Sequence, residues 1–251
     1  MNQNFRESYR EMSLRAAVKK GLRKIGLEAH RFVPASSPTA QIIASLRKFG
    51  IDLVLDVGAN QGQFALEIRS GGYEGNILSF EPLSTAHNQL LQTSSRDPKW
   101  DVCPRTALGD HDGEIEINIA GNSVSSSIFP MLESHRNAAP ESAYMGKEKV
   151  GMAMLDTLVR PYLDQSRAAF LKIDTQGYEW QVLDGAKDSL SRFQGVLLEL
   201  SFVPLYEGQH LWREMIDRLE ADGFSLWAMQ PGFTDAHSGQ TLQADGIFFR
   251  T

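Results

Sequence analysis

The sequence predicts an α/β domain with a mostly parallel β-sheet and helices on both faces, and two observations lead to this prediction. From about residue 38 onward, short apolar segments typical of strands alternate with amphipathic segments typical of helices. That alternation is characteristic of parallel strands joined by crossover helices. The last two strand-like segments, 224–229 and 246–250, are separated by a loop alone. We therefore expect an antiparallel hairpin at the C-terminus, at one edge of the sheet.

A basic segment precedes this domain, and we assign it to residues 1–37. Residues 1–31 contain eight basic and three acidic residues, a net charge of +5, whereas the whole chain carries −6 and the remainder therefore −11. The helical spacing of four apolar residues predicts a basic amphipathic helix over about 11–26 that ends at Gly26: Leu14, Val18, Leu22 and Ile25. Such a helix fits docking on the domain, contact with a second copy in a homodimer, or peripheral contact with an anionic membrane surface.

The domain that we expect over residues 38–251 begins with a helix, because Ser37 is a good N-cap and Pro38 a good first helical residue. The predicted order after that helix is strand 51–57, helix 63–70, strand 76–80, helix 84–93, a strand within 100–108, strand 114–119, strand 150–155, helix 156–163, strand 168–173, helix 177–190, strand 196–200 and helix 211–222. Residues 121–149 are rich in Ser, Asn, Ala and Pro, and we expect a long loop or lid with short helical pieces.

Bulk properties exclude several classes of function. A net charge of −6 does not favour general nucleic-acid binding. No apolar segment approaches the roughly 20 residues that cross a bilayer, and the N-terminus lacks the apolar core of a signal peptide. We therefore expect a cytoplasmic protein, with membrane association through the basic helix as the alternative.

A glycine-rich turn follows the first core strand and opens the next helix: Asp56-Val57-Gly58-Ala59-Asn60-Gln61-Gly62. The glycines let the backbone approach a ligand closely, and the N–H groups at a helix start favour an anionic or polar group. The spacing is Gly-x-x-x-Gly, not the Gly-x-Gly-x-x-Gly of dinucleotide-binding proteins. Taken alone, the turn also fits a plain connection between strand and helix.

Acidic residues follow two further strands. Glu81 lies 25 residues after Asp56, directly after a strand, where a carboxylate can accept both hydroxyls of a ribose. Capping the helix that starts near Pro82 is the alternative. Asp174 follows the strand 168–173 and should lie at the switch point of the sheet, where ligands bind. Lys172 is on the same side of that strand, and we expect the two to pair, because a buried lysine needs a partner.

Together these segments resemble the FkbM family of S-adenosylmethionine-dependent methyltransferases. The resemblance implies a Rossmann-like class I methyltransferase sheet, S-adenosylmethionine as cofactor, and methyl transfer to oxygen. The implied acceptor is a hydroxyl of a small molecule or glycan: a sugar of a polysaccharide, lipopolysaccharide or glycolipid, or a secondary metabolite. The matching segments are Leu55–Gly62, Phe80–Pro82, Ala107–Asp110, Asn122–Ser127, Leu155–Leu158, Leu171–Glu179 and Leu183–Ala186.

The family pattern implies site residues. The implied cofactor-binding residues are Asp56, Gly58, Ala59, Asn60, Gly62 and Glu81, with Thr106 and Ala107 near the adenine. Asp56 would meet the methionine ammonium, directly or through water. Ser126 and Ser127 would line the methionine end or the acceptor pocket; a solvated loop is the alternative. Where many relatives have glutamate before Gly177, this chain has Gln176.

A base within reach of the acceptor assists the transfer, because a sugar hydroxyl is a poor nucleophile at neutral pH. The candidate catalytic residues are Asp174, Glu199 at the end of the next strand, and Lys172. A loop histidine, His135 or His210, is a further candidate for the base and for substrate contact. Asp174 and Glu199 would also suit Mg²⁺, but no third ligand stands out, so we predict no metal.

Two other classes of function stay open. An NAD-dependent enzyme is disfavoured by the glycine spacing and by the C-terminal hairpin. A non-catalytic cofactor-binding module is disfavoured because Asp56, Gly58, Glu81 and Asp174 are all present.

Overall fold

The computed structural model describes residues 16–27 and 31–251, and the chain divides into two units between Ala44 and Ser45, inside helix α2 (Pro38–Lys48). In the first unit residues 16–24 are helical, and Gly26 has a φ of 76°, which favours glycine after a helix. The remainder of the predicted basic helix, 11–15, lies outside the described residues. Within the described ranges, no helix is long and apolar enough to span a membrane.

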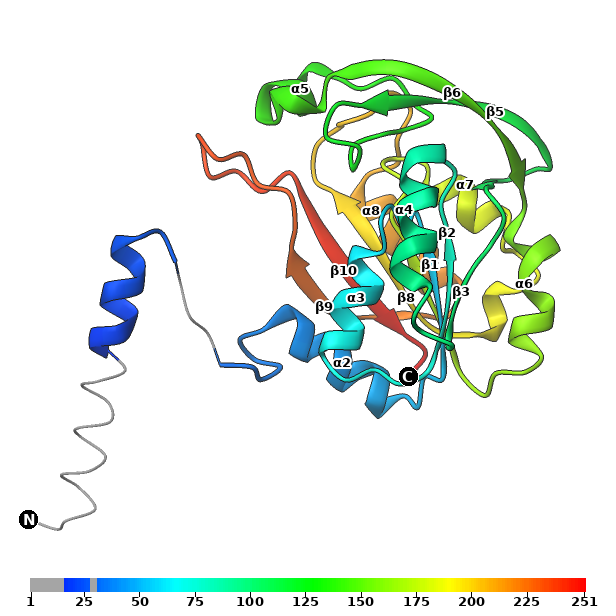
Figure 1. Cartoon of the computed structure of the whole chain (residues 1–251), viewed down its shortest axis with the longest axis horizontal. Coiled ribbons are helices and arrows are strands. Elements are labelled where there is room, and N and C mark those ends of the chain that lie inside the picture. The colour runs from blue at the N-terminus through cyan, green and yellow to red at the C-terminus, as the bar shows by residue number, and fades with distance from the viewer. Residues whose placement is uncertain (1–15, 28–30) are drawn as a thin grey trace, which may run out of the picture. The chain divides into compact units, whose positions relative to one another are not determined.

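The second unit is built on a seven-stranded sheet with the order β3-β2-β1-β7-β8-β10-β9 (Figure 1). β1, β2, β3, β7 and β8 are parallel, whereas β10 runs antiparallel to both β8 and β9. The predicted C-terminal hairpin at a sheet edge is therefore confirmed. The strands are β1 (Leu53–Val57), β2 (Asn76–Phe80), β3 (Trp100–Val102), β7 (Ala169–Ile173), β8 (Phe193–Ser201), β9 (Ser225–Pro231) and β10 (Gln243–Phe249).

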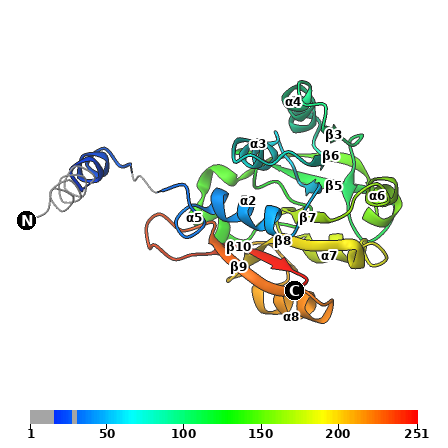
Figure 2. The ribbon, with the colours of Figure 1, turned by 90° about the horizontal axis from the view of Figure 1, so that it is seen from below.

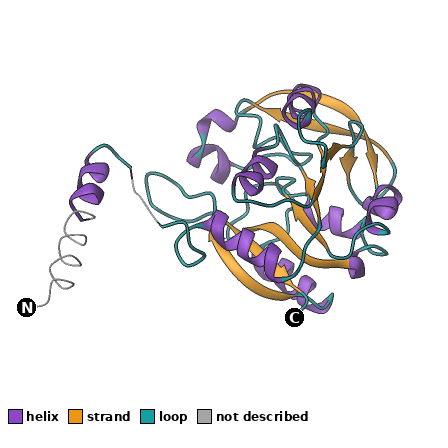
Figure 3. Cartoon of the chain, turned by 60° about the horizontal axis from the view of Figure 1, so that its bottom comes forward, coloured by secondary structure: helices purple, strands orange, loops and turns teal. Residues whose placement is uncertain are grey.

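Helices cover both faces of this sheet, as predicted. Figure 2 shows α3 on one side of the strands and α7 and α8 on the other, and Figure 3 shows the strands at the centre of the unit. β1 and β7 are buried along their whole length because both of their faces are covered. The helices are α3 (Gln63–Ser70), α4 (Ser84–Ser94), α6 (Leu155–Leu163), α7 (Glu179–Asp184) and α8 (Trp212–Ala221).

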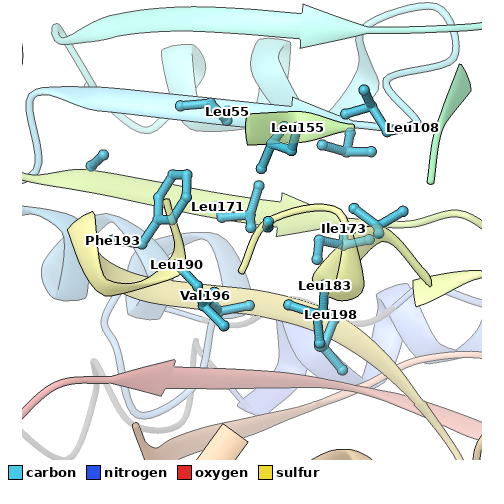
Figure 4. Close-up of a cluster of buried hydrophobic side chains, with 14 of the residues drawn as sticks. Leu55, Leu108, Leu155, Leu171, Ile173, Leu183, Leu190, Phe193, Val196 and Leu198 are labelled. Carbon is cyan, nitrogen blue, oxygen red and sulfur yellow. The ribbon is translucent and has the colours of Figure 1, made fainter. Parts of the chain in front are cut away.

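The main core lies between the central strands and helices α6 and α7. Its centre is formed by fully buried aliphatic side chains of β7, β8 and the two helices (Figure 4): Leu155, Leu171, Ile173, Leu183, Val196 and Leu198. This core fixes the strand ends from which the polar residues of the site extend.

A second sheet of three strands, in the order β4-β6-β5, corrects two predictions. The strand predicted within 100–108 is two strands, β3 in the main sheet and β4 (Ala107–Leu108) in the small one. The predicted lid over 121–149 is partly strand, because β6 (Tyr144–Ala153) begins well before residue 150 and pairs with β5 (Gly113–Ala120). Within β6 only Val150 and Met152, near the end of the strand, are buried, so only that part shows the apolar sequence pattern of a strand. Short helical pieces do occur, as predicted: α5 (Glu133–Ala138) and a 3₁₀ turn (Pro140–Ser142).

The helix predicted over 177–190 is also shorter than expected. α7 ends at Gly185, whose backbone lies so close to residue 109 that a Cβ would be 1.9 Å from the carbonyl oxygen of Gly109. The chain then turns into a 3₁₀ segment (Leu190–Arg192) before β8. The apolar periodicity continues past the helix because Ala186 and Leu190 are still buried in the core.

Candidate active site at the carboxyl edge of the sheet

The segments singled out in the sequence meet at one edge of the main sheet. The parallel strands β2, β1, β7 and β8 lie side by side, so their carboxyl ends share an edge. Asp56 is near the end of β1, Glu81 directly after β2, Asp174 directly after β7 and Glu199 near the end of β8. In Figure 1 the small sheet formed by β5 and β6 passes over the side of the domain to which β8 points.

The glycine-rich turn after β1 is pressed against the end of β7. Gly58 has a φ of 71°, and the N–H groups of Gly58 and Ala59 both donate to the carbonyl oxygen of Phe80 at 3.0 Å. A Cβ at position 58 would lie 1.9 Å from the carbonyl oxygen of Asp174. Glycine is required here because a side chain would separate the turn from the strand end that carries Asp174.

The turn continues through Asn60 to Gly62, the N-cap of α3. Gly62 has a φ of 93°, and a Cβ there would lie 2.7 Å from the ring of Trp100. Asn60 donates from Nδ2 to the Ser123 hydroxyl at 3.4 Å, while its Oδ1 is buried and has no hydrogen-bond partner among the described residues. Buried polar atoms are nearly always paired, so this acceptor fits a donor on a bound cofactor.

Lys172 is the buried cation at the centre of the site. Its Nζ lies 3.0 Å from Oδ1 of Asp56 and 3.4 Å from Oδ2 of Asp174, and it donates to the carbonyl oxygen of Gly58 at 3.2 Å. The predicted pairing with Asp174 is therefore present, and Asp56 is a second, closer partner. Burial alone would lower the pKa of Lys172, but the Asp56 and Asp174 carboxylates outweigh it and raise that pKa.

Asp56 itself is completely buried. Burial raises its pKa, and the neighbouring Lys172 charge counteracts that rise. Neither carboxylate oxygen of Asp56 has a directed hydrogen bond among the described residues. Both oxygens can still accept from a donor, as expected for contact with an ammonium, directly or through water.

Glu81 is buried and oriented by the backbone. Its Oε2 accepts the N–H of Asn60 and its Oε1 the N–H of Leu83, both at 2.8 Å. Burial raises the pKa of Glu81 to about 7, although these two hydrogen bonds act in the opposite direction. Each carboxylate oxygen retains a second acceptor position, so the residue fits a ribose diol while it also holds the glycine-rich turn.

Asp174 and Glu199 are joined by Gln176, the residue that stands where many relatives have glutamate. The side-chain amide of Gln176 donates to Oδ1 of Asp174 at 2.8 Å and to Oε2 of Glu199 at 2.6 Å. Its Oε1 accepts from the Tyr206 hydroxyl at 2.8 Å. Its place after a buried strand marks Gln176 as a candidate site residue in the sequence. Its partners could not be predicted, because Glu199 and Tyr206 lie 23 and 30 residues away.

A further carboxylate, Asp245, was missed. It lies on β10 directly opposite Glu199, because the antiparallel register pairs these two positions. Burial, Asp174 and Asp245 raise the pKa of Glu199 well above its usual value, and Lys172 counteracts this. Burial and Asp174 raise the pKa of Asp245 to about 6. Within the described ranges, no group of three or more acidic, histidine or cysteine side chains could hold a metal ion.

The serine loop, residues 122–127, contacts both sides of the site. The Ser123 hydroxyl accepts from Asn60 in the glycine-rich turn, and the Ser127 hydroxyl donates to the carbonyl oxygen of Gln176 at 2.6 Å. Ser127 is buried, and its hydroxyl also accepts the N–H of Phe129. These contacts place the loop over the carboxyl edge, with Ser127 engaged in holding it there.

The two candidate histidines have other partners. His135 is buried with its ring centroid 5.2 Å from that of Tyr206; burial lowers its pKa, and its Nδ1 has no partner among the described residues. His210 stacks on Trp180 at 4.0 Å and lies 3.4 Å from Glu214. The structure therefore places His135 against Tyr206, whose hydroxyl bonds Gln176, and gives His210 neighbours on α7 and α8.

Three other predicted positions have local contacts. The Ser126 hydroxyl donates to the carbonyl oxygen of Ser123 and so closes the turn of its own loop. The Thr106 hydroxyl donates to the carbonyl oxygen of Pro104, and Ala107 is buried as the first residue of β4. Both follow β3, next to the β2 end that carries Glu81.

The strand order β3-β2-β1-β7-β8-β10-β9, with a glycine-rich turn after β1 and an acid after β2, defines a class I methyltransferase fold. The sequence matches the family described as "Methyltransferase FkbM domain" over residues 56–226, more than half of the chain. The chain belongs to this family and is an S-adenosylmethionine-dependent methyltransferase.

Solved structures of methyltransferases are similar at low identity. Magnesium protoporphyrin IX methyltransferase from Synechocystis PCC 6803 is 11% identical, with 85% of this chain and 78% of that chain covered and a TM-score of 0.45. Fibrillarin from Aeropyrum pernix is 11% identical, with 82% and 74% covered and a TM-score of 0.44. A TehB-like methyltransferase from Corynebacterium glutamicum is 10% identical, with 100% of both chains covered and a TM-score of 0.40. No sequence among the curated proteins matches the chain.

The Glu81→Ala variant is expected to lose roughly 2–4 kcal/mol of cofactor binding, because a charged acceptor disappears and its ligand donors stay unpaired. Calorimetric titration with S-adenosylhomocysteine measures this loss. The Glu148→Ala variant is a suitable control, since Glu148 bonds Ser84 and Arg105 but not the turn after β1. An affinity of Glu81→Ala equal to that of the control would remove Glu81 from the ribose site.

Proposed function

We propose that this methyltransferase acts on oxygen, at a hydroxyl of a glycan or another small molecule. The observation that carries the proposal is the pair of strand-end carboxylates, Asp174 and Glu199, bridged by Gln176 beside the glycine-rich turn. Carboxylates accept hydrogen bonds from hydroxyls and take up the proton that a hydroxyl releases when it is alkylated. A serine-rich, polar loop over the same edge suits a partner rich in hydroxyls.

The residues of the site fit the cofactor. The Asp56 carboxylate and the unpartnered Oδ1 of Asn60 would hold the ammonium end, the N–H groups at the start of α3 the carboxylate, and Glu81 the ribose. Thr106 and Ala107 are proposed as neighbours of the adenine. S-adenosylmethionine supplies an electrophilic methyl group on a sulfonium.

Asp174 is the proposed base. Its side chain is 35% exposed, so an acceptor can reach it, whereas Lys172 and Gln176 donors hold it in place. In methyl transfer to a hydroxyl, the Asp174 carboxylate would accept the hydroxyl proton that the alkylated oxygen releases. Orienting donor and acceptor accounts for much of the expected rate.

The segment between β5 and β6 is the proposed acceptor lid, together with the loop 202–210. Three contacts support this: Ser123 with Asn60, Ser127 with Gln176, and Tyr206, whose hydroxyl lies 3.2 Å from the carbonyl oxygen of Ser125. A lid in this position would exclude water from the sulfonium.

Transfer of a labelled methyl group tests the proposal. Purified protein is incubated with S-adenosylmethionine carrying a deuterated methyl group and with neutral oligosaccharides, and the products are hydrolysed and analysed by mass spectrometry. An O-methyl ether that resists acid and base is expected, and Asp174→Asn should lose most of the activity. Label recovered on nitrogen, or as a base-labile ester, would contradict methylation of a hydroxyl.

A chain that starts at Ser36 is expected to bind S-adenosylhomocysteine as tightly as the full chain, because the basic segment precedes every cofactor motif. Calorimetry measures the two affinities.

Sedimentation with anionic vesicles tests whether the basic segment binds a membrane surface. If its charge of +5 binds anionic lipid, only the full chain should sediment with the vesicles, and added salt should release it. Equal sedimentation of both chains would favour docking or dimerisation instead.

A further inference from the structure

Gln176 is buried in a backbone conformation that side chains rarely adopt. Its φ is 55°, and such strain in residues other than glycine persists only where surrounding contacts hold it. Both donors of its amide face carboxylates, and its Oε1 faces the Tyr206 hydroxyl. Because carboxylates only accept, the amide nitrogen must face them, and the orientation of the amide is fixed.

We propose, on the basis of the proposed function, that Gln176 is a positioning residue. Its amide holds the side chains of Asp174 and Glu199 side by side at the transfer site, and Tyr206 fixes the orientation of that amide.

The charges around the pair explain why a neutral donor is needed there. Asp174 and Lys172 face Glu199 from β7, Asp245 from β10 and Glu179 from α7. Three of these four groups are acidic and, together with burial, they raise the pKa of Glu199 well above its usual value, whereas Lys172 counteracts this rise. The Gln176 amide donates to both carboxylates and does not titrate, so it favours their charged forms and opposes this rise.

Gln176 also connects the pair to the acceptor lid. Its backbone carbonyl accepts from Ser127, and its side-chain partner Tyr206 lies within hydrogen-bond distance of the Ser125 carbonyl. One residue thus joins the serine loop to both carboxylates, and a shift of that loop would reach the charged pair through it.

A second amide supplies a matched control. Gln243, on β10, donates to the same oxygen of Glu199 at 3.3 Å but also to Ser201, not to Asp174. Gln176→Met and Gln243→Met therefore remove the same chemical group from the same carboxylate. Only Gln176→Met also removes the hydrogen bond to Asp174, and with it the bridge between the two carboxylates.

The test compares the affinities of S-adenosylmethionine and S-adenosylhomocysteine by calorimetry between pH 5.5 and 9. The sulfonium charge is present only in the first ligand, so the affinity ratio measures negative charge at the transfer site, and it falls as the pair takes up a proton. In Gln176→Met the midpoint of this fall should move up by about one pH unit, because donors that favour the charged form are lost. Gln243→Met should move it by less than half as much, and Tyr206→Phe by an intermediate amount.

Different outcomes contradict the proposed function and the positioning role of Gln176. If the transfer assay places the labelled methyl group on nitrogen or in a base-labile ester, the proposed function is wrong, whatever the midpoints are. If a folded Gln176→Met variant keeps the wild-type midpoint, or Gln243→Met moves it equally, the positioning role is wrong. If Gln176→Met does not fold, the Tyr206→Phe variant tests the positioning role instead. Tyr73→Phe is its control, because the Tyr73 hydroxyl donates to the carbonyl oxygen of Asn76 and not to Gln176 or the two carboxylates. An unchanged midpoint in Tyr206→Phe then overturns the role.

Discussion

Replacing Lys172 with methionine is expected to lower the free energy of unfolding by about 3–5 kcal/mol at pH 8, because removal of one partner leaves a buried charge uncompensated. The uncompensated group is Asp56, which is completely buried and 3.0 Å from the Lys172 ammonium. Urea unfolding of the two proteins measures the difference. The Lys187→Met variant, which loses an exposed pair with Asp184, should change stability by no more than about 0.5 kcal/mol.

The pH dependence of this loss has a definite sign. Burial raises the folded-state pKa of Asp56, and without Lys172 nothing on β7 lowers it again. A carboxyl with a raised folded pKa binds a proton on folding, so stability falls as the pH rises from the unfolded pKa, near 4, through the folded one. The destabilisation should therefore be smaller at pH 5 than at pH 8. A loss below about 1 kcal/mol at pH 8, or one that grows towards acid, would contradict the buried pair.

The Gly58→Ala variant is expected to lose about 2–5 kcal/mol of stability and to bind S-adenosylhomocysteine at least tenfold more weakly. A left-handed conformation costs a residue with a Cβ about 1–2 kcal/mol, and the overlap with the Asp174 carbonyl forces a backbone shift that adds about 1–3 kcal/mol. The overlap also moves the turn away from Asp174, and with it the N–H groups proposed to meet the ligand.

Gly50 separates these two effects. It has a φ of 65°, close to that of Gly58, but a Cβ there would meet no atom within 4 Å. Gly50→Ala should therefore show only the conformational cost and no change in ligand affinity. Equal losses of stability in the two variants, measured by urea unfolding, would mean that the contact between the turn and the end of β7 contributes nothing.

The parts of the site that are local in sequence could be predicted. The turn from Asp56 to Gly62, Glu81 after β2 and Asp174 after β7 each follow an apolar strand, and parallel strands place their carboxyl ends together without further information. Lys172 was predictable as well, because a lysine two residues before an aspartate in a buried strand needs a partner on the same side.

The parts that depend on long-range register could not be predicted. Asp245 faces Glu199 only because β10 pairs antiparallel to β8, and no local pattern fixes which residues align. The Gln176 bridge depends on Tyr206, from a loop after β8. The early start of β6 could not be predicted for a different reason. Its first half is not buried and lacks the alternating apolar residues that predict a strand, at Gly146, Lys147, Glu148 and Lys149.

The small sheet has an evolutionary consequence. Among the described residues, β4, β5 and β6 form a sheet of their own, and no strand of the main sheet pairs with a strand from residues 107–153. The segment can therefore diverge, or be exchanged between relatives, without altering the register of any strand of the main sheet. Such an exchange has to retain the contacts of the segment with the rest of the unit, among them the close approach of Gly109 to Gly185 and the hydrogen bonds of Ser123 with Asn60 and of Ser127 with Gln176. We expect chimaeric proteins that keep these contacts to fold and bind cofactor while they inherit the acceptor preference of the inserted segment.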